Sequence, residues 1–428
     1  MPNRKFRVLL TCLVLVAVTP AIVAQRRPAR SSVPTGTLLI ITKAEDERRW
    51  DNNLRLLFES PSAAIRARAA LAAGRIGDEG SVPALTELLE KDKDTSVRSM
   101  AIFALGEVES SAGADALLAV LKNTRADGDL RARAVEALGK IAAALPREQE
   151  ARQKELAAAI LEALKFENAR RTAPDEQAIL FGLTAALRTR PADAGPVIAE
   201  FLTYSDPRVR ADAGNALARL RLKDGNEQLR RLLTADVDPI VRANAARVLG
   251  ITEDKPSFDA LVSRATTDSD SRVRVSAIRA LASLKDSRAT EPLLKRAQAL
   301  NKPANANEIL EIATTLGRLL AQKNDQTAIE WLRKVNESLN HTAPEVENAF
   351  VSIAPATYIA DFGSPDEAKR EVQKTILLNW RSASGIASGL GEVAALPDSV
   401  GNKAELAAAA QGLLRAMLDY RNSGLTIN

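Results

Sequence analysis

An apolar residue followed at once by arginine recurs six times along the chain, each time at the start of a run of small and apolar residues. The six pairs are Ile65-Arg66, Val97-Arg98, Leu130-Arg131, Val209-Arg210, Val241-Arg242 and Val273-Arg274. Successive pairs are 32, 33, 79, 32 and 32 residues apart. Units of this length cannot bury an apolar face alone and must stack on their neighbours, so the spacing predicts an all-α solenoid of antiparallel helix pairs.

The residues that follow each pair predict one amphipathic helix. Counting the apolar residue of a pair as position 0, positions 0, 4, 8 and 11 form one buried stripe. Position 7 is alanine in five repeats and Val248 in the other, which allows close approach of a neighbouring helix. Position 9 is glycine at Gly74, Gly106, Gly139 and Gly250, and we interpret these glycines as helix terminators.

Each repeat also carries signals for its boundaries and for a second helix. Three residues before position 0 stand predicted N-cap residues, namely Ser62, Asp94, Asp127, Asp206, Asp238 and Asp270. Proline follows Asp206 and Asp238, as expected for a first helical residue. The partner helix is predicted about twelve residues upstream of position 0, at Leu85, Leu118, Val197, Leu229 and Leu261.

The chain divides into four predicted parts. Residues 1–24 resemble an export signal, because Arg4, Lys5 and Arg7 precede an apolar run from Val8 to Val18 that is too short for a comfortable membrane span. Residues 25–42 are a predicted linker, in which 37–42 (TLLIIT) form a brief strand or docking segment. Repeats fill 43–300, and Thr42 with Glu45 forms a capping box that opens the first helix. Residues 301–428 are predicted to be diverged helical repeats and a C-terminal cap.

The irregular regions are also predicted to be helical. A long helix is expected over 146–168, followed by a degenerate repeat at 175–189. In the C-terminal third, helices are expected over 307–323, 326–339, 344–359, 366–396 and 403–422.

Charge does not favour nucleic acid. The net charge is +5, but six of the 59 basic residues lie in positions 1–32, which hold no acid, and this leaves 53 basic against 54 acidic residues. A global electrostatic attraction to DNA or RNA is therefore not predicted, although a local basic stripe is still compatible with these numbers.

The run from Val97 to Val108 (VRSMAIFALGEV) and the Ala-Leu-Gly-Lys-Ile sequence at 137–141 resemble HEAT repeats of the short bacterial kind, often called phycobilisome-lyase HEAT-like repeats. The resemblance is strong over 60–300 and weak elsewhere. It implies the solenoid fold. The family includes chromophore lyases, but most such arrays look like adaptor surfaces, and the repeat motif carries no catalytic residue to transfer.

Two sets of arginines are candidate binding residues. The first set is the arginines of the six recurring pairs, called the phrase arginines below: Arg66, Arg98, Arg131, Arg210, Arg242 and Arg274. They either present a ladder to an anionic partner or pair with capping aspartates of their own or the adjacent repeat. We favour the structural role. Arg68, Arg133, Arg247 and Arg279, at other positions of the same helices, are better candidates for an exposed binding stripe.

No catalytic, cofactor-binding or metal-binding residues are predicted. His341 is the single histidine and is interpreted as a turn residue, and Cys12 lies inside the leader. Ser384 has no recognisable base, and the acids at 45–47, 148 and 150 lie on polar helix faces. Trp331, Trp380, Tyr358 and Tyr420 gather in the C-terminal third, where they either form a binding surface or fill irregular gaps in the core.

These observations predict a non-enzymatic protein-interaction scaffold, exported to the periplasm or secreted, that binds a protein or peptide on its concave helix face and not nucleic acid. An uncleaved leader would instead anchor it to the membrane. A chromophore lyase is an alternative, which requires a polar pocket with convergent acid and tyrosine side chains. A phosphate-backbone binder is another, which requires strong salt dependence. The oligomeric state stays open.

Overall fold

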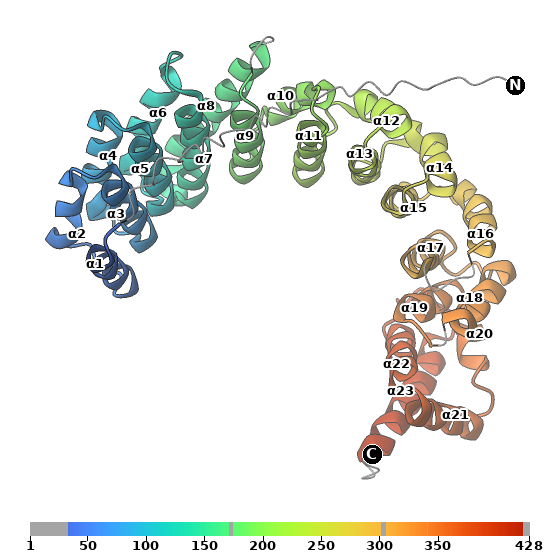
Figure 1. The fold of residues 1–428 in the computed structure, drawn as a ribbon. Helices are drawn as coiled ribbons and strands as arrows, with labels where there is room; N and C mark the ends of the chain where they lie inside the picture. The colour runs from blue at the N-terminus through green and yellow to red at the C-terminus, as the bar shows by residue number, and fades with distance from the viewer. Residues whose placement is uncertain (1–32, 171–173, 301–304, 340, 423–428) are drawn as a thin grey trace, which may run out of the picture.

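The protein forms an open arc of stacked helices, described here from a computed structural model over residues 33–170, 174–300, 305–339 and 341–422 (Figure 1). The described residues contain no β-strand. The predicted leader, 1–24, lies outside them. None of the helices in the described ranges is long and apolar enough to cross a membrane.

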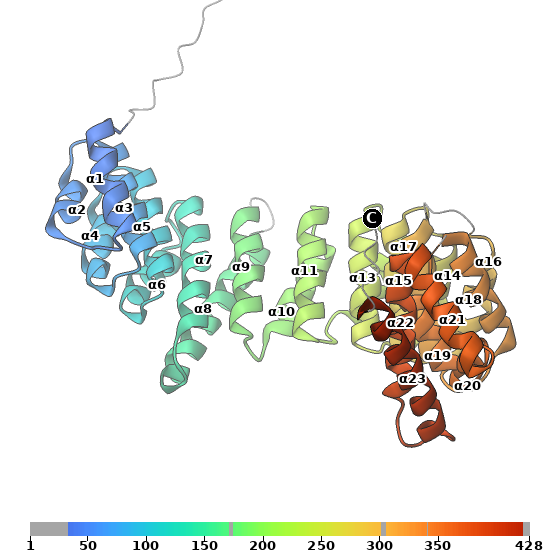
Figure 2. The same cartoon turned by 90° about the horizontal axis from the view of Figure 1, so that it is seen from below.

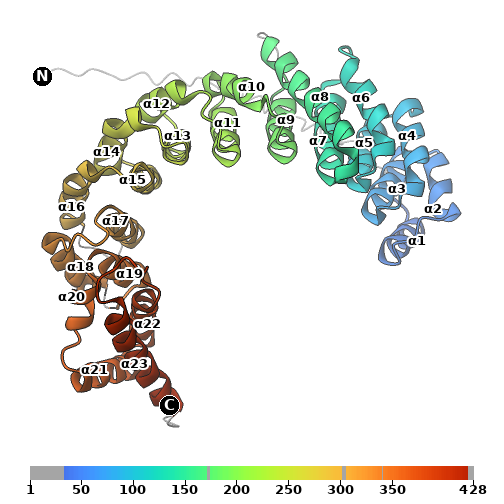
Figure 3. The same cartoon turned by 180° about the vertical axis from the view of Figure 1, so that it is seen from behind.

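Two layers of helices build the arc, and the view from behind shows the same inner and outer rows (Figure 3). The inner layer consists of α1 (Thr35–Asp46), α3 (Ala63–Ile76), α5 (Thr95–Val108), α7 (Gly128–Ala144), α9 (Glu176–Thr189), α11 (Pro207–Leu220), α13 (Pro239–Ile251), α15 (Ser271–Leu284), α17 (Ala306–Leu319) and α19 (Pro344–Ile353). The outer layer consists of α2 (Asn52–Leu56), α4 (Val82–Lys91), α6 (Ala114–Lys122), α8 (Glu150–Ala169), α10 (Ala194–Glu200), α12 (Asn226–Ala235), α14 (Phe258–Thr267), α16 (Thr290–Gln298) and α18 (Gln326–Leu339).

The C-terminal end departs from this alternation. Here lie α20 (Pro355–Ala360), α21 (Pro365–Leu378), α22 (Trp380–Ala394) and α23 (Lys403–Asn422), and α22 continues the inner row by packing on α19. The helices predicted at 344–359 and 366–396 are each two helices. Ala354 takes an extended φ of −152° because it precedes Pro355, which disfavours helical backbone in the residue before it. Asn379 (φ −158°) caps the start of α22 by accepting the N–H groups of Arg381 and Ser382.

One N-terminal prediction is wrong. The segment at 37–42 is neither strand nor linker but the middle of α1, which begins at Thr35, so the capping box expected at Thr42 does not form. Ile41 and Ala44 are buried against the stack, while Leu38, Leu39 and Ile40 stay exposed on its open end. Packing on α3 decides the helical state of this apolar stretch, whose local pattern also suits a strand.

The irregular middle follows the prediction closely. The long helix is α8, with 20 residues, and the degenerate repeat is α9, whose cap Asp175 accepts the N–H groups of Gln177 and Ala178. The other predicted aspartate caps also accept backbone N–H groups at the starts of their helices, from Asp94 to Asp270. Ser62 makes no such bond.

The repeated glycines have a different role from the predicted one. They lie inside the helices, where the next inner helix comes closest. A Cβ atom on Gly106 would lie 2.8 Å from both Cα and Cβ of Ala137, and one on Gly250 would lie 2.7 Å from those atoms of Ala280. Position 9 of one repeat therefore meets position 7 of the next, and the pair of small residues sets the spacing of the inner row.

Candidate functional site

The inner helices form the concave side of the arc, and viewed from below α7, α9, α11 and α13 stand side by side along it (Figure 2). Positions 0, 4 and 8 are turned into the core, as Val97, Ala101 and Leu105 show, and only Ile65, at position 0 of the first repeat, is half-buried. Positions 3 and 6 are half-buried or exposed in all six repeats. The chemistry of the concave side is therefore set by positions 3 and 6, which vary between repeats.

The phrase arginines do not reach this surface as free charges. In three repeats the guanidinium forms a bidentate ion pair with an aspartate 26 residues later, in the next repeat: Arg66 with Asp92, Arg210 with Asp236 and Arg242 with Asp268. For Arg66, Nε and Nη2 lie 2.6 and 2.8 Å from the two carboxylate oxygens of Asp92. The Arg66 side chain holds the pKa of Asp92 below its usual range.

The structural interpretation of these arginines is confirmed, but the predicted partner is wrong. The acceptor is not the capping aspartate but a second aspartate, two residues before the cap. This second aspartate also accepts the backbone N–H of the cap residue. Asp236, for example, accepts the N–H of Asp238 at 2.9 Å. No aspartate occupies the equivalent position for Arg98 and Arg131. Arg98 donates instead to the backbone oxygen of Leu89, and Arg131 donates to that of Leu121. Arg274 pairs with Glu308 instead.

The four arginines predicted as an exposed stripe do lie on the inner helices, but three of them have acidic partners. Arg68 forms a bidentate pair with Glu45, Arg133 pairs with Glu136, and Arg279 pairs with Glu311. Arg247 has no acidic partner in the described part of the chain, and its Nη2 donates to Asn215 Oδ1 at 2.7 Å. A continuous stripe of free positive charge is therefore not present among these four.

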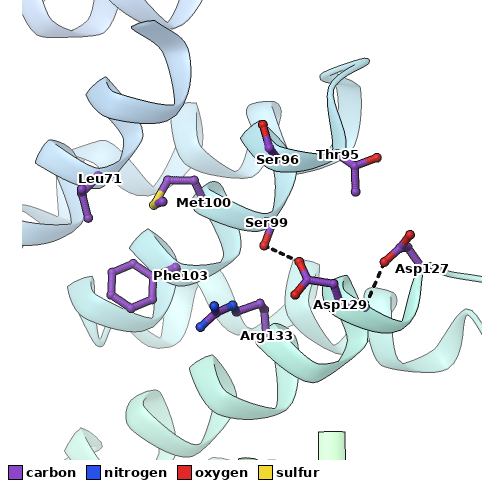
Figure 4. Close-up of a pocket in the computed structure, with 9 residues that line it drawn as sticks. All are labelled: Leu71, Thr95, Ser96, Ser99, Met100, Phe103, Asp127, Asp129 and Arg133. Carbon is purple, nitrogen blue, oxygen red and sulfur yellow. Dashed lines mark hydrogen bonds between the residues drawn. The ribbon is translucent and has the colours of Figure 1, made fainter. Parts of the chain in front are cut away.

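A hollow with an apolar floor opens on the concave side between α3, α5 and α7, with a volume of about 670 Å³ (Figure 4). Leu71, Met100 and Phe103 are half-buried in it. Its polar lining is Thr95, Ser96, Ser99, Asp127, Asp129 and Arg133. Ser99 donates to Asp129 at 2.7 Å, so part of this rim is already held in place.

Cations and aromatic rings meet beside the hollow. The Lys140 ammonium lies 4.6 Å from the centre of the Phe103 ring, and the Arg133 guanidinium lies 5.4 Å from that of Phe181 on α9. Aromatic rings, methionine and arginine are the residue types enriched at the centres of protein interfaces. This cluster was not predicted from the sequence. The available signal was that Leu71 and Phe103 occupy position 6, and Met100 position 3, where other repeats have polar residues.

The aromatic residues of the C-terminal third mostly fill the core. Trp331 and Tyr358 are 6% and 2% exposed, which confirms the alternative that they fill irregular gaps. Trp380 is 74% exposed, and the side chain of Tyr420 lies outside the described part. Tyr358 packs edge-on against Phe350 and Phe362.

An acid and a tyrosine do converge in this region, but away from solvent. Tyr358 donates to Glu347 Oε2 at 2.7 Å, and Asn336 donates to Oε1 at 2.7 Å. Burial raises the pKa of Glu347, which is 4% exposed. Neither Glu347 nor Tyr358 lines any of the hollows described in this structure.

The remaining predicted candidates show no catalytic arrangement. His341 Nδ1 lies 2.8 Å from the backbone oxygen of Leu339, as expected in a turn, and Ser384 is exposed on α22. Among the acidic residues, Glu45 pairs with Arg68, Glu47 with Arg49, and Glu150 with Lys154. No group of three or more His, Cys, Asp or Glu side chains in the described ranges is arranged to hold a metal ion.

Comparison with solved structures finds the same architecture in larger proteins. Importin beta is 13% identical to this chain, with a TM-score of 0.58, and 89% of the chain aligns with 54% of importin beta. The karyopherin Kap121p, in a structure bound to the extreme C-terminus of the protein phosphatase Cdc14p, is 13% identical with a TM-score of 0.50, over 91% of this chain and 46% of Kap121p. The chain thus spans about half the length of these proteins.

The structure of the complex of CpcE and CpcF of phycocyanin lyase from Nostoc sp. PCC7120 is also similar, with 20% sequence identity and a TM-score of 0.36. The match covers 64% of this chain and 99% of the chain in that complex. No curated protein matches the chain significantly. The family described as HEAT repeats matches residues 51–139, 165–250 and 226–303, which together cover more than half of the sequence. With the stacked helix pairs of the structure, this match shows that the chain belongs to the HEAT-repeat family.

Proposed function

We propose that this protein is a non-enzymatic interaction scaffold that binds a protein or peptide on its concave face. A HEAT-repeat solenoid is a fold typical of protein-interaction scaffolds. The observation that carries the proposal is the hollow of Leu71, Met100 and Phe103, an apolar floor within a polar face. Such a site suits an apolar side chain of a partner, surrounded by the polar side chains of Ser96, Asp129 and Arg133.

The same face supports a protein partner better than a nucleic acid. Asp127 and Asp129 line the hollow, and Glu136 lies beside Arg133 and Lys140. These acids would repel a phosphate backbone. A second function as a chromophore lyase is not favoured, since Glu347 and Tyr358 are buried against each other instead of lining a pocket.

The proposed compartment is the cell envelope, with the first 24 residues as the export signal. Cell fractionation combined with mass spectrometry of the N-terminus tests this part. A mature chain that begins at Gln25 in the periplasmic or secreted fraction supports export. A cytosolic chain that retains Met1 contradicts it, and a membrane fraction with the intact leader supports the anchored alternative.

A pull-down with the full chain as bait tests the binding face. The Met100→Lys variant places a charge on the apolar floor, and Val237→Lys places the same charge on a turn where the native side chain is 90% exposed. A discrete protein retained by the wild type and by V237K but lost with M100K is expected. Equal retention by M100K, or recovery of nucleic acid alone, would contradict the proposal, provided that circular dichroism shows both variants folded.

A further inference from the structure

Three arginines of the inner helices α11, α13 and α15 lie close together but differ in their pairing. Arg219, Arg247 and Arg279 come from three adjacent inner helices. In the part of the chain that the structure describes, Arg279 pairs with Glu311, but neither Arg219 nor Arg247 is in an ion pair. This contrasts with Arg66, Arg210 and Arg242, each of which has a bidentate aspartate partner.

Arg247 is the most unusual of the three. It is half-buried, its Nη2 donates to Asn215, and its Nε is buried without any hydrogen-bond partner. Two other arginines of the described ranges, Arg131 and Arg264, also have an unpartnered buried Nε, but each lies next to an acid, Glu167 and Asp268 respectively. Arg247 thus combines partial desolvation with the lack of a counter-charge.

The nearest charges add to the free-energy cost of keeping the Arg247 guanidinium charged and partly buried. Burial, and then repulsion from Arg219 and Arg279, lower the pKa of Arg247. Asp212 on α11 is half-buried and makes no ion pair with Arg247 in this structure. A bound anion would supply the missing counter-charge and relieve the repulsion, and a carboxylate matches the planar fork of a guanidinium.

We propose that Arg247, with Arg219 and Arg279 beside it, forms a carboxylate-binding site on the concave face that recognises an Asp or Glu side chain of an acidic peptide segment. This inference rests on the proposed function and names the chemistry of the partner. The charge complementarity favours a peptide over nucleic acid because Asp212 on α11 and Glu311 on the neighbouring α17 would meet the flanking phosphates.

The test is a selection from a library of phage-displayed random peptides on the immobilised full chain. Arg247→Gln removes the central charge, and Arg231→Gln is the matched control on α12 of the outer layer, where the arginine is 75% exposed. The wild type and R231Q are expected to enrich peptides that contain Asp or Glu, and R247Q is not. A selected peptide, synthesised and measured by fluorescence anisotropy, should bind R247Q about tenfold or more weakly.

One variant of the peptide and one further variant of the protein serve as controls. Changing the acidic residue of the peptide to its amide should weaken binding to the wild type by a similar factor, with no further loss in R247Q. Arg219→Gln alters an exposed side chain at the edge of the site, and a smaller loss of affinity is expected from it. Selected peptides without enriched acids, or equal affinity for R247Q and R231Q, would overturn the site.

The same experiment separates this inference from the proposed function. Neutral peptides that bind the wild type and lose affinity with Met100→Lys would support the concave face while overturning the carboxylate site. If no selected peptide depends on Met100 or on Arg247, both proposals fail. A single-stranded oligonucleotide that binds more tightly than the peptides, and loses affinity with R247Q, would assign the arginines to nucleic acid instead.

Discussion

At the residue scale, the ion pairs between repeats combine electrostatics with turn geometry. Asp236 accepts two hydrogen bonds from Arg210, at 2.8 and 2.9 Å, and one from the N–H of Asp238. Its side chain is 4% exposed, so the charge is compensated by these donors and not by water. The same arrangement recurs at Asp92 and Asp268, which makes it a repeated joint of the array.

Removing one partner of such a joint should destabilise the protein. For Asp236→Ala we expect a loss of about 2 kcal/mol or more in the free energy of unfolding, because Arg210 keeps its desolvation without its acceptor. Urea unfolding followed by circular dichroism measures this loss. The control is Glu227→Ala in the exposed pair with Arg231, for which a change within about 0.5 kcal/mol is expected. Equal effects of the two substitutions would contradict this account.

Glu347 should give stability a pH dependence of the opposite sign to that of the paired aspartates. Burial raises its pKa in the folded state. The folded protein therefore binds a proton more tightly than the unfolded chain, and stability falls as pH rises from about 4.3, the unfolded value, through the raised pKa. Glu347→Gln keeps polar contacts to Asn336 and Tyr358 without the buried charge. We expect E347Q to be more stable than the wild type at pH 8 and to match it near pH 4, measured by thermal unfolding. An equal loss at both pH values would contradict the prediction.

At the element scale, small residues determine how closely the inner helices stack. Gly106 meets Ala137, and Gly250 meets Ala280, at distances that leave no room for a methyl group. These contacts explain why alanine and glycine, and not larger apolar residues, recur at positions 7 and 9. The local sequence makes glycine look like a helix stop, and only the neighbouring helix shows its role.

Gly106→Ala should therefore destabilise the array although alanine is the better helix former. The added methyl group meets backbone atoms of α7, and overpacking of this kind costs about 1–3 kcal/mol. Gly412→Ala in α23 is the matched control, because nothing lies within 4 Å of its added Cβ, and a gain of about 0.5–1 kcal/mol is expected there. Thermal unfolding of the two variants compares them directly, and a gain in both would contradict the close-contact role.

At the scale of the whole molecule, the irregular middle joins two regular arrays. Glu167, at 2% exposure, is the centre of this joint: it pairs with Arg131 and Arg170 and accepts the N–H of Asp175. Arg131 also lies over the ring of Phe166, 4.2 Å from its centre. Coupling between the α1–α7 and α9–α19 segments runs through these contacts in addition to the direct packing of α7 on α9.

Glu167→Ala should weaken this coupling. It leaves Arg131 buried without its counter-charge, and in a solenoid the stability depends on interfaces between neighbouring units. We expect urea unfolding to separate into two transitions, where the wild type shows one. Glu167→Gln, which retains an acceptor for the Asp175 N–H, should show a smaller effect. A single transition at an unchanged midpoint in E167A would contradict the role of this joint.

The sequence by itself determined the fold class, the repeat length, the capping aspartates and the buried stripe, because these follow from helical periodicity and short-range hydrogen bonds. It did not determine the acceptors of the phrase arginines, the contacts of Gly106 and Gly250 or the helical state of 37–42. Each of these depends on a neighbouring helix that the local pattern does not specify. The apolar residues Leu71, Met100 and Phe103 stand out in the sequence at polar positions, but only the tertiary structure decided that they line one hollow and that Arg247 is unpaired, since burial and counter-charges come from residues one repeat away.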